Sequence, residues 1–115
     1  MTLCEVHAMF EITLLIPESD NSGEKFGPET SARWEALLAD RFGGFSLLPG
    51  TTHGGWRGPD GTMYRDRLRG YAVWAVGLAC GGKAVEAARE ACAIFAQEAV
   101  SVRFLGLAEI VSKAV

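Results

Sequence analysis

The side chains best suited to chemistry gather between residues 54 and 76. Trp56 and Arg57 follow a glycine pair, Tyr71 lies on an apolar stretch, and Glu98 comes later, beside a glutamine. Arginine can hold a carboxylate or phosphate through two parallel hydrogen bonds, and aromatic rings add flat contact area. We therefore expect a binding site lined by Trp56, Arg57, Tyr71 and Glu98, which would take a small anionic ligand or a protein partner.

The same residues have a simpler interpretation. Arginines recur at positions 57, 65, 67 and 69, and acids such as Asp60, Asp66 and Glu98 are available to pair with them. Arginine and aromatic side chains are also common in ordinary protein interfaces. The basic-aromatic cluster is thus a ligand site or a solvated strand face.

Metal, nucleophile and cofactor chemistry is not indicated by the remaining motifs. Cys4-x-x-His7 has the spacing of metal ligands, but no second pair completes a tetrahedral site. His53 stands alone, and no spacing in the sequence brings a cysteine to it as nucleophile and base. We expect no metal and no cofactor.

Nucleic acid and membrane are also disfavoured as partners. Arg69-Gly70-Tyr71-Ala72 matches part of an RNA-recognition strand, but Val73 stands where a second stacking aromatic is needed. The net charge of −3 disfavours nucleic-acid binding, which needs a basic face that displaces counterions from the phosphates. The sequence contains no apolar run of membrane-spanning length and no export signal. Three widely spaced cysteines suit free thiols in the cytoplasm.

Hydrophobic periodicity gives the elements that must position these side chains. Residues 6–16 alternate, with Ala8, Phe10, Ile12, Leu14 and Ile16 on the face expected to be buried. Proline at 28, helical apolar spacing and Gly43-Gly44 predict a helix over 29–42. The other predicted elements are strands at 45–48, 51–57, 62–78, 100–105 and 108–111, a turn at 58–61, and a helix from 83 to about 99.

This order predicts one α+β domain over residues 1–115, with a mobile loop at 17–28. The simplest arrangement is the split βαβ of ferredoxin-like proteins, an antiparallel sheet with two helices on one face. We expect Trp34, Phe42 and Trp74 to fill the core beneath the helices. The opposite sheet face would then be open to a second copy, which predicts a homo-oligomer, in its simplest form a homodimer.

Three short motifs resemble a family of small bacterial α+β proteins of unknown function. They are Arg41-Phe42-Gly43-Gly44-Phe45-Ser46, Gly54-Gly55-Trp56-Arg57 and Phe95-Ala96-Gln97-Glu98-Ala99-Val100. The family pattern is RF-x-G-[LF]-[ST], then G-x-W-R, then F-x-Q-E-[AS]-V, and Asp66-Arg67 departs from it where a glutamate is commoner. The resemblance implies the fold and carries no activity.

Two functions fit these features. The leading expectation is a non-enzymatic binding module that acts as a homo-oligomer. The alternative is a cofactor-independent enzyme on a small organic substrate, with Glu98 or His53 as acid or base. A closed pocket between sheet and helices that holds Glu98 or His53 would favour the enzyme, and a solid core there would favour the module.

Overall fold

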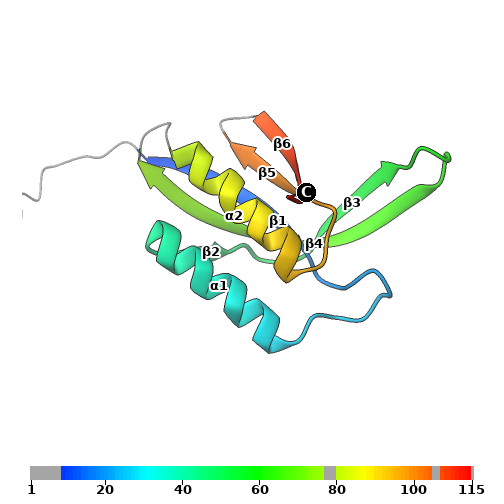
Figure 1. Cartoon of the computed structure of the whole chain (residues 1–115), viewed down its shortest axis with the longest axis horizontal. Helices are drawn as coiled ribbons and strands as arrows, with labels where there is room; N and C mark the ends of the chain where they lie inside the picture. Colours follow the sequence, from blue (N-terminus) through cyan, green and yellow to red (C-terminus); the bar gives the residue numbers. More distant parts are fainter. Residues whose placement is uncertain (1–8, 77–79, 105–106, 115) are drawn as a thin grey trace, which may run out of the picture.

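The chain folds into one antiparallel sheet and two helices. The computed structural model describes residues 9–76, 80–104 and 107–114 (Figure 1). The elements, in chain order, are β1 (Met9–Pro17), α1 (Pro28–Phe42), β2 (Ser46–Leu47), β3 (Thr52–Arg57), β4 (Met63–Val76), α2 (Cys80–Ile94), β5 (Ala99–Phe104) and β6 (Leu107–Ser112).

The sheet has the ferredoxin-like topology that the sequence predicts. Its strand order is β2-β4-β1-β5-β6, and β3 pairs with β4 off this path. Every pairing among the described strands is antiparallel. Strands β5, β1, β4 and β2 form the split βαβ arrangement, and β6 extends it by one edge strand. The prediction of this fold class is confirmed.

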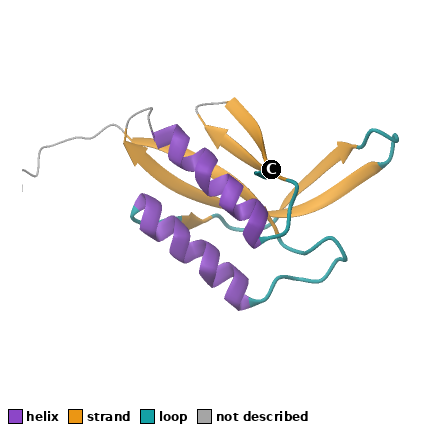
Figure 2. Ribbon diagram, in the orientation of Figure 1, coloured by secondary structure: helices purple, strands orange, loops and turns teal. Residues whose placement is uncertain are grey.

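Both helices cover the same face of the sheet (Figure 2). Ile12, Leu14 and Ile16 of β1 are buried there with Trp34 of α1 and a run of small residues from α2. Because side chains alternate along a strand, Glu11 and Thr13 of β1 point to the other face. Phe10 is partly buried on the helix side, against Phe104. The predicted inward set is confirmed, except for Ala8, which lies outside the described residues.

The first helix begins and ends where its sequence signals place it. Pro28 occupies the first turn, and Gly43 closes the helix at φ 80°, a left-handed conformation that glycine adopts without strain. Helix α2 begins at Cys80, three residues before the predicted start. Arg41 and Glu90 join the two helices through contacts of 2.8 and 2.7 Å. No helix among the described residues is long and apolar enough to cross a membrane.

The prediction that Trp74 fills the core is wrong. Trp74 is 44% exposed on the open sheet face, whereas Tyr71 and Val73 are buried beneath the helices. The register explains the difference, because Leu14 pairs with Tyr71 and Ile12 with Val73. Residues paired across a sheet share a face, so the inward residues of β1 fix those of β4. The predicted core residue Trp34 is fully buried.

The β3–β4 hairpin extends beyond the helices as two strands alone (Figure 1). Its turn is the predicted Gly58–Gly61 segment, which Gly61 closes by donating its N–H to the Gly58 carbonyl at 2.9 Å. Trp56 and Tyr64 face each other across the two strands and stack with ring centroids 4.7 Å apart. Each ring remains about half exposed.

Replacing Leu14 by alanine should test the predicted core. Leu14 is fully buried, so Leu14→Ala should lower the free energy of unfolding by about 2–5 kcal/mol. Urea denaturation gives the measurement. Glu11→Ala, on the open face of the same strand, is the control and should change the free energy by less than about 0.5 kcal/mol. Equal effects would contradict the assignment of the two faces.

Candidate functional site

The four residues predicted to form a site lie in three places. Trp56 and Arg57 are exposed in the hairpin, where Arg57 donates to the carbonyl of Gly61 at 2.9 Å. Tyr71 lies seven residues along β4 from Tyr64, the strand partner of Trp56. At about 3.3 Å per residue, that separation is roughly 23 Å. The hairpin pair and Tyr71 therefore do not share a cleft.

Glu98 lies apart from the others at the junction of α2 and β5. Its carboxylate contacts the Lys113 ammonium at 3.0 Å, and the carboxylate side chain is 82% exposed. Glu98 is therefore not buried against Arg57, because the short α2–β5 connection keeps it beside Lys113. The role of these four residues in binding stays a prediction, but the structure does not bring them together.

A cavity opens at the end of β1, where the loop that follows brings Phe26 against Phe95, the residue after α2. Its volume is about 160 Å³. The residues that line this β1-end cavity are Ile16, Pro17, Glu18, Lys25, Phe26, Ser31, Arg69, Tyr71 and Phe95. Ile16, Tyr71 and Phe95 are buried and supply an apolar floor, whereas Glu18, Lys25 and Arg69 bring charge of both signs.

Local hydrogen bonds hold the loop that forms one wall of the cavity. Glu18 donates its N–H to the Arg67 carbonyl at 3.0 Å, and Phe26 donates to the Glu18 carbonyl at 3.2 Å. At the loop tip, the Asp20 carboxylate accepts hydrogen bonds from Ser22 and Glu24. The bond from the Ser22 hydroxyl is the main cause of the lowered pKa of Asp20. These contacts keep Lys25 and Phe26 at the cavity.

The carboxylate of Glu18 is held in part by the strand side of the cavity. Its Oε2 accepts a hydrogen bond from the Thr51 hydroxyl at 2.5 Å. Its Oε1 has no hydrogen-bond partner among the described residues. Arg69 projects from β4 at the position paired with Ile16, and no ion pair links its guanidinium to another described residue. Both charged groups can therefore contact a ligand.

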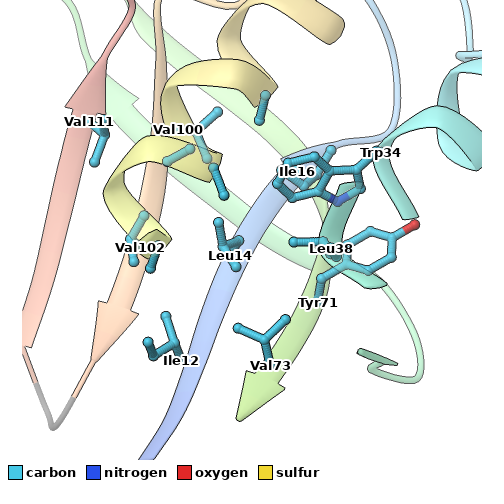
Figure 3. Close-up of a cluster of buried hydrophobic side chains, with 14 of the residues drawn as sticks. Ile12, Leu14, Ile16, Trp34, Leu38, Tyr71, Val73, Val100, Val102 and Val111 are labelled. Atoms are coloured by element: carbon cyan, nitrogen blue, oxygen red, sulfur yellow. The ribbon is translucent and has the colours of Figure 1, made fainter. Parts of the chain in front are cut away.

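Tyr71 connects the cavity floor to α1. Its hydroxyl donates to Glu35 Oε2 at 2.8 Å. Burial, followed by the hydrogen bond to Glu35, raises the pKa of Tyr71 above its ordinary value. The Trp34 ring is perpendicular to the Tyr71 ring, with centroids 6.2 Å apart (Figure 3). Tyr71 is thus a neutral hydrogen-bond donor and a rigid part of the floor.

A second hollow of about 500 Å³ lies between α2 and β6. Val85, Arg89, Ile110, Val111, Ser112, Lys113 and Ala114 line it. Its charged groups are both basic, and the Lys113 ammonium already contacts Glu98. Within the described part of the chain, no group of three or more acidic, histidine or cysteine side chains could hold a metal ion. The β1-end cavity is the better candidate because it combines both charges with aromatic walls.

Sequence reasoning identified only part of this cavity. Tyr71 belongs to the predicted site and Arg69 to the predicted basic-aromatic cluster. Glu18, Lys25 and Phe26 lie in the segment expected to be a mobile loop. One sequence feature, Pro17-Glu18, could have indicated Glu18 as a site residue. A charged residue that directly follows a buried strand lies at the end of the sheet, where ligands often bind.

Comparisons with known proteins give the fold but no sequence relative. No family model matches the chain, and no curated protein matches it. A phage SAM lyase in complex with S-methyl-5'-thioadenosine has a similar structure, with a TM-score of 0.67 over 99% of this chain and 97% of that chain. The apo state of a phage SAM lyase gives a TM-score of 0.62 over the same shares. Sequence identity is 14% in both cases.

These comparisons contradict the expectation of a non-enzymatic binding module. The solved structures that match nearly the whole chain are those of an enzyme, in one case with a small molecule bound. The comparisons agree better with the alternative expectation of an enzyme. Neither Glu98 nor His53 lines the β1-end cavity, where the carboxylate is that of Glu18. The resemblance to small bacterial proteins of unknown function stays a prediction.

Alkaline unfolding should report the buried phenol of Tyr71. Because the folded state raises the pKa of Tyr71, its neutral form stabilises the fold fully below about pH 10, the ordinary tyrosine value. This stabilisation is lost as pH rises further toward the folded pKa. The difference in unfolding free energy between the wild type and Tyr71→Phe should therefore narrow above pH 10.

Tyr64→Phe is the matched control for this measurement, since Tyr64 is exposed on the same strand. The difference in unfolding free energy between Tyr64→Phe and the wild type should stay constant from pH 8 upward. A constant difference for Tyr71→Phe would show that the Tyr71 phenol does not titrate with folding.

Proposed function

We propose that this protein is a lyase that acts on S-adenosylmethionine or a closely related sulfonium nucleoside. The observation that carries the proposal is the similarity, over nearly the whole chain, to a SAM lyase bound to S-methyl-5'-thioadenosine. The β1-end cavity supports it independently. Its acidic and basic side chains complement the ammonium and carboxylate of an amino acid, and its aromatic rings suit a sulfonium cation.

The chemistry needs no cofactor, because the substrate supplies its own leaving group. S-methyl-5'-thioadenosine is S-adenosylmethionine without its amino-carboxypropyl group, so the bond that breaks joins the sulfonium sulfur to Cγ of that group. When the substrate's carboxylate oxygen attacks Cγ, a C–O bond forms and the C–S electron pair returns to sulfur. The products are a neutral thioether and an amino-lactone, and no proton is transferred.

This route assigns the protein a positioning role rather than a base. The attack requires the carboxylate to fold back to Cγ on the side opposite the sulfur, and holding that geometry can supply much of the rate. Glu98 and His53, the predicted acid or base residues, are both exposed and lie outside the cavity. Glu18 is the carboxylate that lines the cavity, and in an elimination route it would be the base.

The size of the cavity supports self-association as part of the proposal. Sites that enclose a drug-sized ligand measure roughly 300–1,000 Å³, whereas this cavity measures about 160 Å³. The nucleoside must therefore extend beyond it. The open sheet face exposes Met9, Trp74 and Ile110, and such a patch suits contact with a second copy. A homo-oligomer in the cytoplasm remains our expectation.

Incubation with S-adenosylmethionine tests the proposed function directly. Mass spectrometry should detect S-methyl-5'-thioadenosine. Proton NMR should then identify the second product as an amino-lactone that keeps both Cβ hydrogens, because the unsaturated amino acid of an elimination has the same mass. An unsaturated amino acid in place of the lactone would assign an elimination, with Glu18 as the base. Arg69→Glu should lower kcat/KM by roughly ten-fold or more, because it reverses a charge at the cavity.

Arg33→Glu is the control for this charge reversal. Arg33 is an exposed arginine on α1 that does not line the cavity, so the variant should keep wild-type activity. Absence of any cleavage product from the folded wild-type protein would contradict the proposed function.

Light scattering tests the expected homo-oligomer. The chain mass is 12.3 kDa, and the particle should have a multiple of that mass. Trp74→Glu should shift the particle toward the monomer, because a buried carboxylate on the sheet face is costly. Lys83→Glu, at an exposed position of α2, should leave the mass unchanged. A strict monomer at the concentrations used for activity would contradict this part of the proposal.

A further inference from the structure

We infer that the β1-end cavity is a subsite for the amino-acid end of the ligand, in which Arg69 binds the α-carboxylate and Glu18 binds the α-ammonium. This inference rests on the proposed function for the identity of the whole substrate. The subsite itself follows from the size, charge and apolar floor of the cavity. It would also bind a free α-amino acid with an unbranched apolar side chain.

The volume selects the amino-acid end over the nucleoside. A cavity of about 160 Å³ has the volume of roughly five water molecules in the liquid, at about 30 Å³ each. That space accommodates a group with a few carbon atoms and two small charged ends. An adenosine with its ribose needs a site of the size that encloses a drug-sized ligand, and it would have to lie outside this cavity.

The charges around the cavity determine the orientation of such a ligand. Glu18 directly follows the end of β1, and Arg69 lies beside it in the middle of β4, since Pro17 pairs with Leu68 and Ile16 pairs with Arg69. Glu18 Oε1 has no hydrogen-bond partner among the described residues, and the same is true of the Arg69 guanidinium. Arginine matches a carboxylate with two parallel hydrogen bonds, and a carboxylate accepts from an ammonium. Lys25 adds a second positive charge at the rim.

The apolar floor of the cavity would contact the methylene chain of the ligand. Ile16, Tyr71 and Phe95 are each 2% exposed and present aliphatic and aromatic surface to the cavity. Tyr71 is fixed by its bond to Glu35, and Phe95 by perpendicular packing on Trp34 and Phe26. A methylene chain placed on this floor loses water from its whole surface, which favours binding by about 25 cal/mol per Å² buried.

Matched changes in ligand and protein test the inference. Binding of L-methionine, its methyl ester and its des-amino analogue would be measured calorimetrically. The proteins compared would be the wild type, Arg69→Ala, Glu18→Gln and the Arg33→Ala control.

For L-methionine, Arg69→Ala and Glu18→Gln should each weaken binding by roughly ten-fold or more. Arg69→Ala should not weaken binding of the ester further, since its carboxylate charge is gone. Glu18→Gln should not weaken binding of the des-amino analogue further.

The outcomes separate this inference from the proposed function. Cleavage of S-adenosylmethionine with no effect of Glu18→Gln or Arg69→Ala on L-methionine binding would overturn the subsite and keep the function. Selective binding of L-methionine by a protein that cleaves nothing would keep the subsite and overturn the function. Equal weakening of all three ligands by each variant would overturn the assignment of charges, and circular dichroism would check that each variant is folded.

Discussion

The packing of Trp34 between the two helices and the sheet is the contact on which the rest of the structure depends. The indole is fully buried and lies perpendicular to Tyr71 of β4 and to Phe95, which directly follows α2. One side chain thus fixes the spacing of both helices over the strand pair that carries the core. Edge-to-face aromatic pairs add roughly 0.5–1.5 kcal/mol each beyond the area that they bury. The Arg41–Glu90 contact joins the last turn of α1 to α2, five residues before Phe95, and restrains the same two helices.

This aromatic cluster also determines where the fold leaves space. The helices cover the sheet as far as Tyr71 and Phe95, and past these rings β4 continues with Arg69, Arg67 and Arg65 toward the hairpin. The loop after β1 returns to the sheet through Glu18 and Phe26 and closes the gap from the side. The cavity is therefore bounded by rigid core on one side and a hydrogen-bonded loop on the other. Such a boundary can hold a substrate in one geometry, which a substrate-assisted reaction requires.

The sequence predicted the elements well because their signals are local. The alternation in residues 10–16, Pro28 before α1 and Gly43 after it act within a few residues, and all are seen in the structure. The face of β4 could not be predicted in this way. Both faces of that strand carry apolar residues, Tyr71 and Val73 on one side and Ala72 and Trp74 on the other. The choice between them depends on the register with β1, which is a long-range property.

The site was harder to predict because convergence in space is not visible in sequence distance. Trp56 and Tyr71 are close along the chain, yet an extended strand carries them far apart. Glu18 and Arg69 are distant along the chain, yet neighbouring strand positions bring them to one cavity. Loop residues such as Lys25 have no periodic pattern that would mark them. Motif reasoning therefore found the residue types that the proposed chemistry uses, and missed the loop that assembles them.

The change in charge during the proposed reaction determines how strongly the cavity would bind the substrate and the nucleoside product. The substrate enters with a sulfonium, an ammonium and a carboxylate, whereas the nucleoside product has lost all three charges. Binding that depends on Glu18 and Arg69 therefore holds the substrate but not the thioether, so the nucleoside product has no charge contact at the cavity to delay its release. The site favours the charged ground state as well, and interactions that bind ground state and transition state equally do not raise kcat. In the proposed reaction, the rate advantage would then come from the carboxylate geometry that Arg69 imposes. The attacking oxygen would be directed at Cγ, and the aromatic floor would exclude water that otherwise solvates it.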